Sequence, residues 1–119
     1  MTNDKPKNVV SLKGLDLEAL GEANDARVPI PGGGGFILFP DPYAKPSDEV
    51  GEYLERLQAA MNDPTLLGGF LKEYLPAAEH KKFVKAFPLW KQQVFILGKV
   101  EEHFASTMGD VGEGDASAS

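Results

Sequence analysis

Few side chains in this sequence could carry out acid–base or metal chemistry, and their spacing does not favour it. His80 and His103 are the only histidines, and there is no cysteine to supply a thiolate. A carboxylate–histidine metal site on a helix uses the spacing Glu-x-x-His, which places both ligands on one face. Ala77 and Val100 stand where the glutamates would be needed. We therefore interpret both histidines as exposed side chains and expect no metal ion and no cofactor.

The other patterns associated with catalysis are incomplete. The run Gly32–Gly35 suggests a phosphate-binding loop, but such a loop continues into Lys and Ser or Thr at the start of a helix. Here Phe36 and Ile37 follow, which favours a hinge or a hairpin turn. No serine lies in a nucleophile motif, and Glu52 and Glu55 fit the solvated side of an amphipathic helix. The sequence predicts that the protein is not an enzyme and has no catalytic residues.

Length and composition narrow the class of protein further. A chain of 119 residues, 42% hydrophobic and 25% charged, forms one domain at most. The net charge of −6 disfavours nucleic acid as a partner, because binding to phosphates depends on basic side chains. No apolar run approaches the roughly 18 residues of a membrane span, and the N-terminus lacks the apolar region of a signal peptide. We expect a soluble intracellular protein that contacts neither nucleic acid nor membrane.

The charges are distributed unevenly along the chain. Residues 64–100 carry six lysines and two glutamates, a local charge of +4, so that the remainder sums to −10. This separation is typical of a solvated lysine face. The alternative interpretation is that it orients association with a partner, or self-association between copies.

The pattern of apolar, proline and glycine residues divides the chain into four segments. We predict a flexible N-terminal arm (1–27), an extended Gly/Pro-rich segment with a short strand (28–46), a helical domain (47–105) and a disordered acidic tail (106–119). The run Phe36–Phe39 is the expected strand. It pairs either with residues 28–30, across the glycine turn, or with another chain. The predicted fold class is mainly α, a small bundle of about four short helices preceded by one short β-strand or hairpin, with disordered N- and C-terminal arms.

Capping residues mark the expected helix boundaries. We predict Ser47 as the N-cap of the first long helix, and Asp63 followed by Pro64 as the start of the next. Gly68 and Gly69 weaken that second helix by about 1 kcal/mol each relative to alanine, unless they allow another backbone to approach closely. Further helices are expected over residues 77–87 and 89–104.

Aromatic residues are dense in the second half of the chain. Most of them are expected in the core, but tryptophan and exposed phenylalanine are also common in partner-binding surfaces. Trp90 is compatible with either role. The candidate partner-binding residues are Phe83, Phe87, Trp90, Phe95 and Phe104.

Read in order, these landmarks resemble the tail assembly chaperones of long-tailed (siphovirus-type) actinobacterial phages. The similarity covers residues 36–119, and its pieces are weakly specific by themselves but more so in this order and spacing. The matching stretches are Phe39-Pro40-Asp41-Pro42 before a capped acidic helix, Leu66-Leu67-Gly68, Lys82-Phe83, Phe87-Pro88-Leu89-Trp90-Lys91, Glu101-Glu102-His103-Phe104 and the tail Gly112-Glu113-Gly114-Asp115-Ala116-Ser117.

The resemblance implies a non-enzymatic assembly factor of the host cell cytoplasm that is absent from the finished virion. Proteins of that family bind the tape measure protein, keep it soluble and recruit the major tail tube protein, whose polymerisation displaces them. Many also have a longer product made by programmed ribosomal frameshifting, and the acidic tail would be its junction.

Two other classes remain open from the sequence. The first is a structural head–tail connector or another minor virion protein, which would be present in purified particles. The second is a small regulatory adaptor, such as an inhibitor of a host enzyme, which would bind a host protein.

Overall fold

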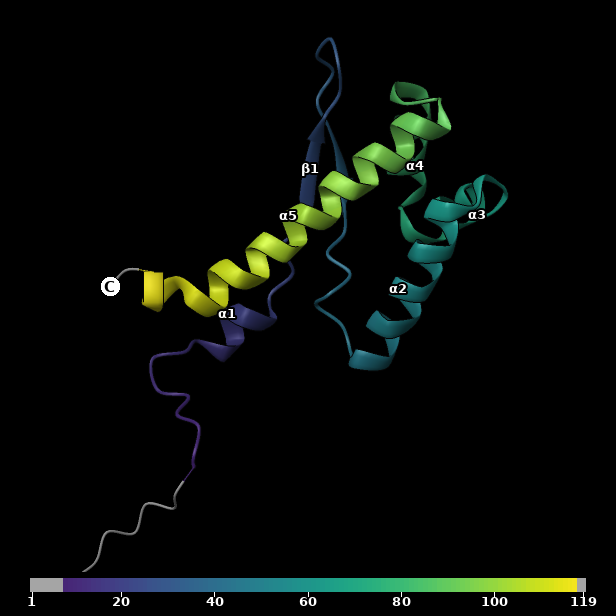
Figure 1. Ribbon diagram of the computed structural model, residues 1–119. Coiled ribbons are helices and arrows are strands. Elements are labelled where there is room, and N and C mark those ends of the chain that lie inside the picture. Colours follow the sequence, from purple (N-terminus) through teal and green to yellow (C-terminus); the bar gives the residue numbers. More distant parts are fainter. Residues whose placement is uncertain (1–7, 118–119) are drawn as a thin grey trace, which may run out of the picture.

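The computed structural model describes the backbone of residues 8–117 and the side chains of residues 8–107 (Figure 1). The described chain is mainly helical with one two-stranded antiparallel hairpin, which confirms the predicted fold class. In chain order the elements are α1 (Leu17–Gly21), β1 (Ala26–Pro29), β2 (Phe36–Phe39), α2 (Ser47–Asn62), α3 (Pro64–Tyr74), α4 (Ala77–Ala86) and α5 (Trp90–Ser117).

The hairpin forms within one chain, across the glycine run. Ala26 lies opposite Phe39 in the register, and Pro29 lies opposite Phe36. All four residues of Gly32–Gly35 have positive φ angles, between 82° and 107°, a region that L-residues with a side chain rarely adopt. Of the two pairings that the sequence leaves open, the structure shows the one across the glycine turn. β1 begins at Ala26, two residues before residue 28, where the sequence predicts that the extended segment starts.

The predicted capping residue is found at the start of α3 but not at the start of α2. Asp63 Oδ1 accepts hydrogen bonds from the amide of Thr65, at 2.9 Å, and from its hydroxyl, at 2.7 Å, with Pro64 as the first helical residue. This junction is as predicted. The assignment of Ser47 as N-cap is wrong, because Ser47 is already helical and the N-cap is Pro46, whose carbonyl accepts from the next turn.

The two glycines of α3 do not mark a close approach of another backbone. A Cβ atom added at Gly68 or Gly69 would meet no atom within 4 Å. Both residues are exposed and contribute only their low helix propensity.

One hydrophobic core connects the hairpin with the four longer helices. The inner face of the hairpin contributes Ile37 and Phe39, and α4 and α5 cover it with Phe83 and Phe104. The far end of α5 lies beside α1 (Figure 1). The largest fully buried side chains are Phe39, Phe83, Phe104, Ile37, Leu67, Leu71 and Leu97.

Helix α5 is longer than expected. The sequence predicts that helical structure ends near residue 105 and that an acidic tail follows, whereas the backbone of α5 is helical to Ser117. Proline is the residue that stops a helix outright, and none occurs after Pro88. The glycines of this stretch weaken a helix without breaking it. The first seven residues of the predicted arm, and residues 118–119 of the predicted tail, lie outside the described part of the chain.

Candidate partner-binding surface

The five aromatic candidates separate into buried and exposed side chains. Phe83 and Phe104 are 0% and 1% exposed and belong to the core. Phe87 is half-buried, with its ring centroid 5.8 Å from that of Phe83. Trp90 and Phe95 are 42% and 63% exposed. In this conformation only the last two offer a large apolar surface to a partner.

Trp90 and Phe95 lie on different faces of α5. Five residues of α-helix correspond to a rotation of roughly 140° about the helix axis. The buried face of α5 is defined by Leu97, Val100 and Phe104. From this spacing Trp90 borders the buried face, whereas Phe95 lies on the side turned away from the core.

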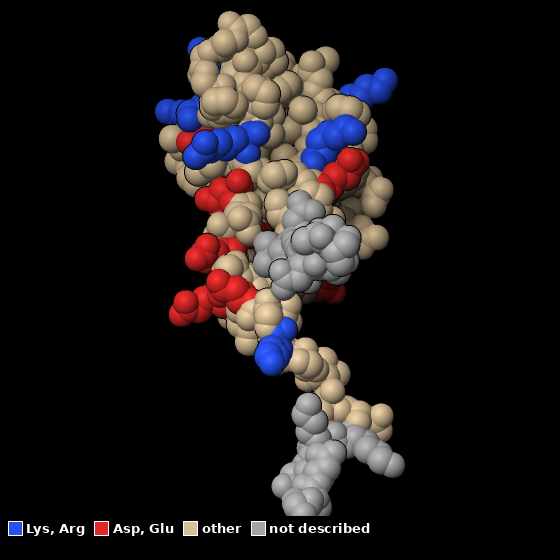
Figure 2. Space-filling model, turned by 90° about the vertical axis from the view of Figure 1, so that its left-hand side faces the viewer, with Lys and Arg blue, Asp and Glu red and all other residues tan. Residues whose placement is uncertain are grey.

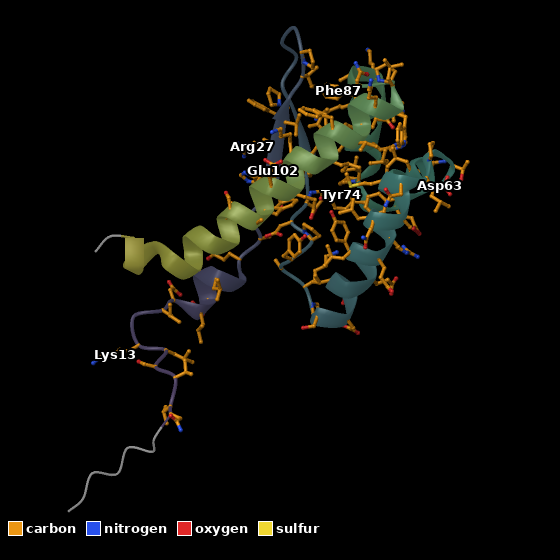
Figure 3. All side chains as sticks on the ribbon, in the orientation of Figure 1. Lys13, Arg27, Asp63, Tyr74, Phe87 and Glu102 are labelled. Atoms are coloured by element: carbon orange, nitrogen blue, oxygen red, sulfur yellow. The ribbon has the colours of Figure 1, made fainter. Side chains whose placement is uncertain are left out.

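Trp90 belongs to an exposed apolar corner where α4 meets α5. Leu89, immediately before the helix, is 60% exposed, and Val84 of α4 is 39% exposed. Gln93 Nε2 donates to the carbonyl of Phe87 at 2.8 Å, and the amide of Leu89 donates to Gln92 Oε1 at 3.1 Å, which fixes the backbone at this turn. Figure 3 labels Phe87 at this corner. We call Leu89 and Trp90 the α4–α5 corner patch.

A lysine accompanies Phe95 on the outer side of α5. Lys99 Nζ lies 5.5 Å from the centroid of the Phe95 ring, in cation–π geometry. The same Nζ lies 3.7 Å from Glu102 Oε1. Lys91, one turn before Phe95, is also exposed. A partner that covers Phe95 therefore meets an aromatic ring flanked by positive charge.

A part-buried hydrogen-bond network that the sequence analysis did not predict joins three segments. The Tyr43 hydroxyl donates to Glu101 Oε1 at 2.5 Å, and the Tyr53 hydroxyl donates to Glu101 Oε2 at 2.8 Å. Burial raises the pKa of both phenols above the usual tyrosine range, and the Glu101 carboxylate raises it further. Both tyrosines therefore remain neutral donors at any physiological pH, as is expected of a structural network.

Tyr74 completes this aromatic region from α3. Its hydroxyl donates to the carbonyl of Pro40 at 2.6 Å, and its ring centroid lies 5.3 Å from that of Tyr53. Burial is the main reason that its pKa is also raised. In Figure 3 Tyr74 lies between α2 and α5. The chain segments around Pro40, α2, α3 and α5 are thus joined through three tyrosines.

No local signal in the sequence identifies these partners. Tyr53 belongs to the periodic apolar face of α2, and Glu101 stands in a polar run of α5. They are separated by 48 positions, and Tyr43 and Glu101 by 58. Helical periodicity reports which face is buried and carries no information about which distant residue is met there.

A second unpredicted contact covers the outer edge of β2. Glu79 Oε1 of α4 accepts the amide of Leu38 at 2.7 Å, and Lys82 Nζ donates to the carbonyl of Phe36 at 3.2 Å. Lys82 also pairs with Glu79 at 3.1 Å. The Leu38 amide and then the Lys82 ammonium hold the pKa of Glu79 below its usual value. The Leu38 amide and the Phe36 carbonyl, which could otherwise pair with another strand, are thus hydrogen-bonded to side chains of α4.

The described residues contain no group of three or more His, Asp or Glu side chains arranged to hold a metal ion. Among the same residues, no helix combines the length and the apolar character that crossing a bilayer requires. Comparisons of the chain with protein-family models, with curated proteins and with solved structures find no match.

Proposed function

We propose that the protein is a phage tail assembly chaperone, which binds the tape measure protein, keeps it soluble and helps to recruit the major tail tube protein. The observation that carries the proposal is the exposure of Trp90 and Phe95 on α5 and of Leu89 just before it. Large exposed apolar side chains of this kind are typical of protein-binding sites. Residues 36–119 resemble the chaperone family in the order and spacing of their motifs, and from this resemblance we infer that the partner is the tape measure protein.

The proposed interaction uses α4 and the first half of α5. A long helical partner exposes apolar stripes, and an aromatic corner beside a second exposed ring can cover such a stripe. Trp90 lies at the corner patch, and Phe95 lies farther along α5 on another side, so that a bound helix would cross α5 rather than follow it. The flanking lysines would favour a partner with acidic residues beside its apolar stripe. The protein would act in the host cell cytoplasm, before the tail is complete.

The direct test is co-expression with the tape measure protein encoded in the same genome. The double variant Trp90→Ala/Phe95→Ala should lower the soluble fraction of the tape measure protein several-fold, because the two large exposed aromatic side chains are lost. Leu54→Ala/Leu66→Ala is the matched control, since both leucines are exposed at 41% and 49% on α2 and α3. Circular dichroism establishes that both variants are folded. Equal protection by the wild type and the Trp90/Phe95 variant would contradict the proposal.

Two further observations separate the chaperone from a structural virion protein. A chaperone should be absent from purified particles, whereas a head–tail connector should be present in a fixed copy number. The coding DNA should contain a slippery heptamer and an overlapping frame near the codon for Ser119 if a longer frameshift product is made.

A further inference from the structure

A hollow along the described residues lies away from the α4–α5 corner patch. It has a volume of about 420 Å³ and is formed by α2, α3 and the segment that connects β2 to α2. Its apolar lining contains three aromatic rings, from Tyr53, Phe70 and Tyr74. The hydroxyls of Tyr53 and Tyr74 are already bonded, to Glu101 and to Pro40. The two tyrosines therefore contribute apolar ring surface to the hollow rather than free hydroxyl groups.

The rim of this hollow is acidic. Asp41, Glu49, Glu52 and Glu73 line it together with two cations, Lys45 and Arg56, for a formal charge of −2. Glu49, Glu52 and Arg56 recur at helical spacing along one stripe of α2.

Part of this negative charge is already neutralised within the chain. Arg56 Nη1 lies 2.7 Å from Glu73 Oε2, and Arg56 Nη2 lies 3.9 Å from Glu52 Oε1. Glu49 makes no salt bridge with another described residue, and its side chain is exposed. The Glu49 carboxylate at the rim can therefore pair with an incoming cation.

We propose that this hollow binds an arginine side chain presented by a partner protein. A cation is attracted both by the carboxylates of the rim and by the faces of aromatic rings. A guanidinium is planar, stacks on rings and can bond a carboxylate through two N–H groups, which an ammonium group cannot do. Arg56 of this chain already pairs with Glu73 through one Nη atom, at 2.7 Å, so one guanidinium is present at this rim. The site is independent of the proposed chaperone function and lies on different elements.

The test uses the full-length protein and a pair of probe peptides that differ only in charge. Ac-Ala-Arg-Ala-NH₂ and its citrulline counterpart have side chains of nearly the same shape, but only arginine is cationic. Titration followed by NMR should show the ring protons of Tyr53, Phe70 and Tyr74 shifting with the arginine peptide. We expect the arginine peptide to bind about two- to fivefold more tightly than the citrulline peptide, the range that a single exposed cation–π contact allows.

Charge variants locate the binding site. Glu49→Gln/Glu52→Gln should weaken binding of the arginine peptide by about fivefold or more, because both carboxylates leave the rim. Glu55→Gln/Glu102→Gln removes the same charge from exposed positions outside the hollow and should change affinity by less than about twofold.

Several outcomes would overturn the proposal. These are equal affinity for the two peptides, equal weakening in the two double variants, and no ring-proton shift with the arginine peptide up to about 10 mM. Binding of tetramethylammonium without binding of the arginine peptide would assign the hollow to a small ligand instead. Trp90→Ala/Phe95→Ala should bind the arginine peptide as the wild type does, so that this result and the co-expression result can fail separately.

Discussion

At the scale of single residues, Glu101 connects parts of the chain that are far apart in sequence. Its two carboxylate oxygens accept separate hydroxyls, one from the segment before α2 and one from α2 itself. Glu102, its neighbour, is exposed and has only a 3.7 Å contact with Lys99. Two adjacent glutamates of the same helix therefore have very different structural roles.

We predict that Glu101→Ala lowers the free energy of unfolding by about 2 kcal/mol or more, because two part-buried tyrosine hydroxyls lose a charged acceptor. Glu102→Ala removes the same charge from an exposed position and should change stability by less than about 0.5 kcal/mol. Urea unfolding followed by circular dichroism measures both values. Similar losses for the two variants would show that the network does not stabilise the fold.

Glu79 gives a prediction for the pH dependence of stability. Its folded-state pKa lies below the ordinary value of 4.5, so its stabilisation is fully present above that value and is lost as the pH falls through the folded-state pKa. The stability difference between the wild type and Glu79→Gln should therefore be largest near pH 6 and shrink towards about pH 3. Urea titrations across this range test it. A difference that is constant with pH would show that the contact with the Leu38 amide does not depend on the carboxylate charge.

At the scale of elements, the sequence predicts most boundaries and few contacts between elements. Local chemistry suffices for the α2–α3 junction, because Asp63 and Pro64 act within one turn. For the hairpin it indicates that Gly32–Gly35 can turn the chain, but it leaves the partner of the strand open. It fails at Ser47, where the preceding proline takes the N-cap position. For the candidate surface, composition indicates aromatic residues, but separating buried Phe104 from exposed Phe95 requires the direction of the buried face of α5.

Replacement by alanine should change the stability of the protein in opposite directions at two glycines, one in the hairpin loop and one in α3. Gly33 has a φ angle of 91°, so Gly33→Ala should destabilise the protein by about 1 kcal/mol through strain in the hairpin loop. Gly68 is helical with open space around it, so Gly68→Ala should stabilise the protein by about 0.5–1 kcal/mol. Thermal unfolding of the two variants beside the wild type measures both effects. A loss of stability in Gly68→Ala would mean that this position is restricted by something other than helix propensity.

At the scale of the whole molecule, the uneven charge along the sequence becomes an uneven charge over the surface. Figure 2 shows, on one face, most of the basic side chains above most of the acidic ones. The exposed lysines of α4 and early α5 lie around the corner patch, while the aromatic hollow has an acidic rim. The two proposed binding regions thus differ in the sign of their charge and would select partners of opposite character. Self-association between copies stays a prediction, for which this arrangement offers complementary surfaces.

The position of Trp90 has a consequence for spectroscopy. It is the only tryptophan of the chain, and it is 42% exposed at the corner patch rather than enclosed in the core. The intrinsic fluorescence of the free protein should therefore resemble that of a solvated indole, and denaturation should change the emission wavelength little. Occupation of the corner patch should shift the emission to the blue and protect it from quenching by iodide. A fluorimeter would then follow partner engagement without a label, while remaining nearly insensitive to unfolding.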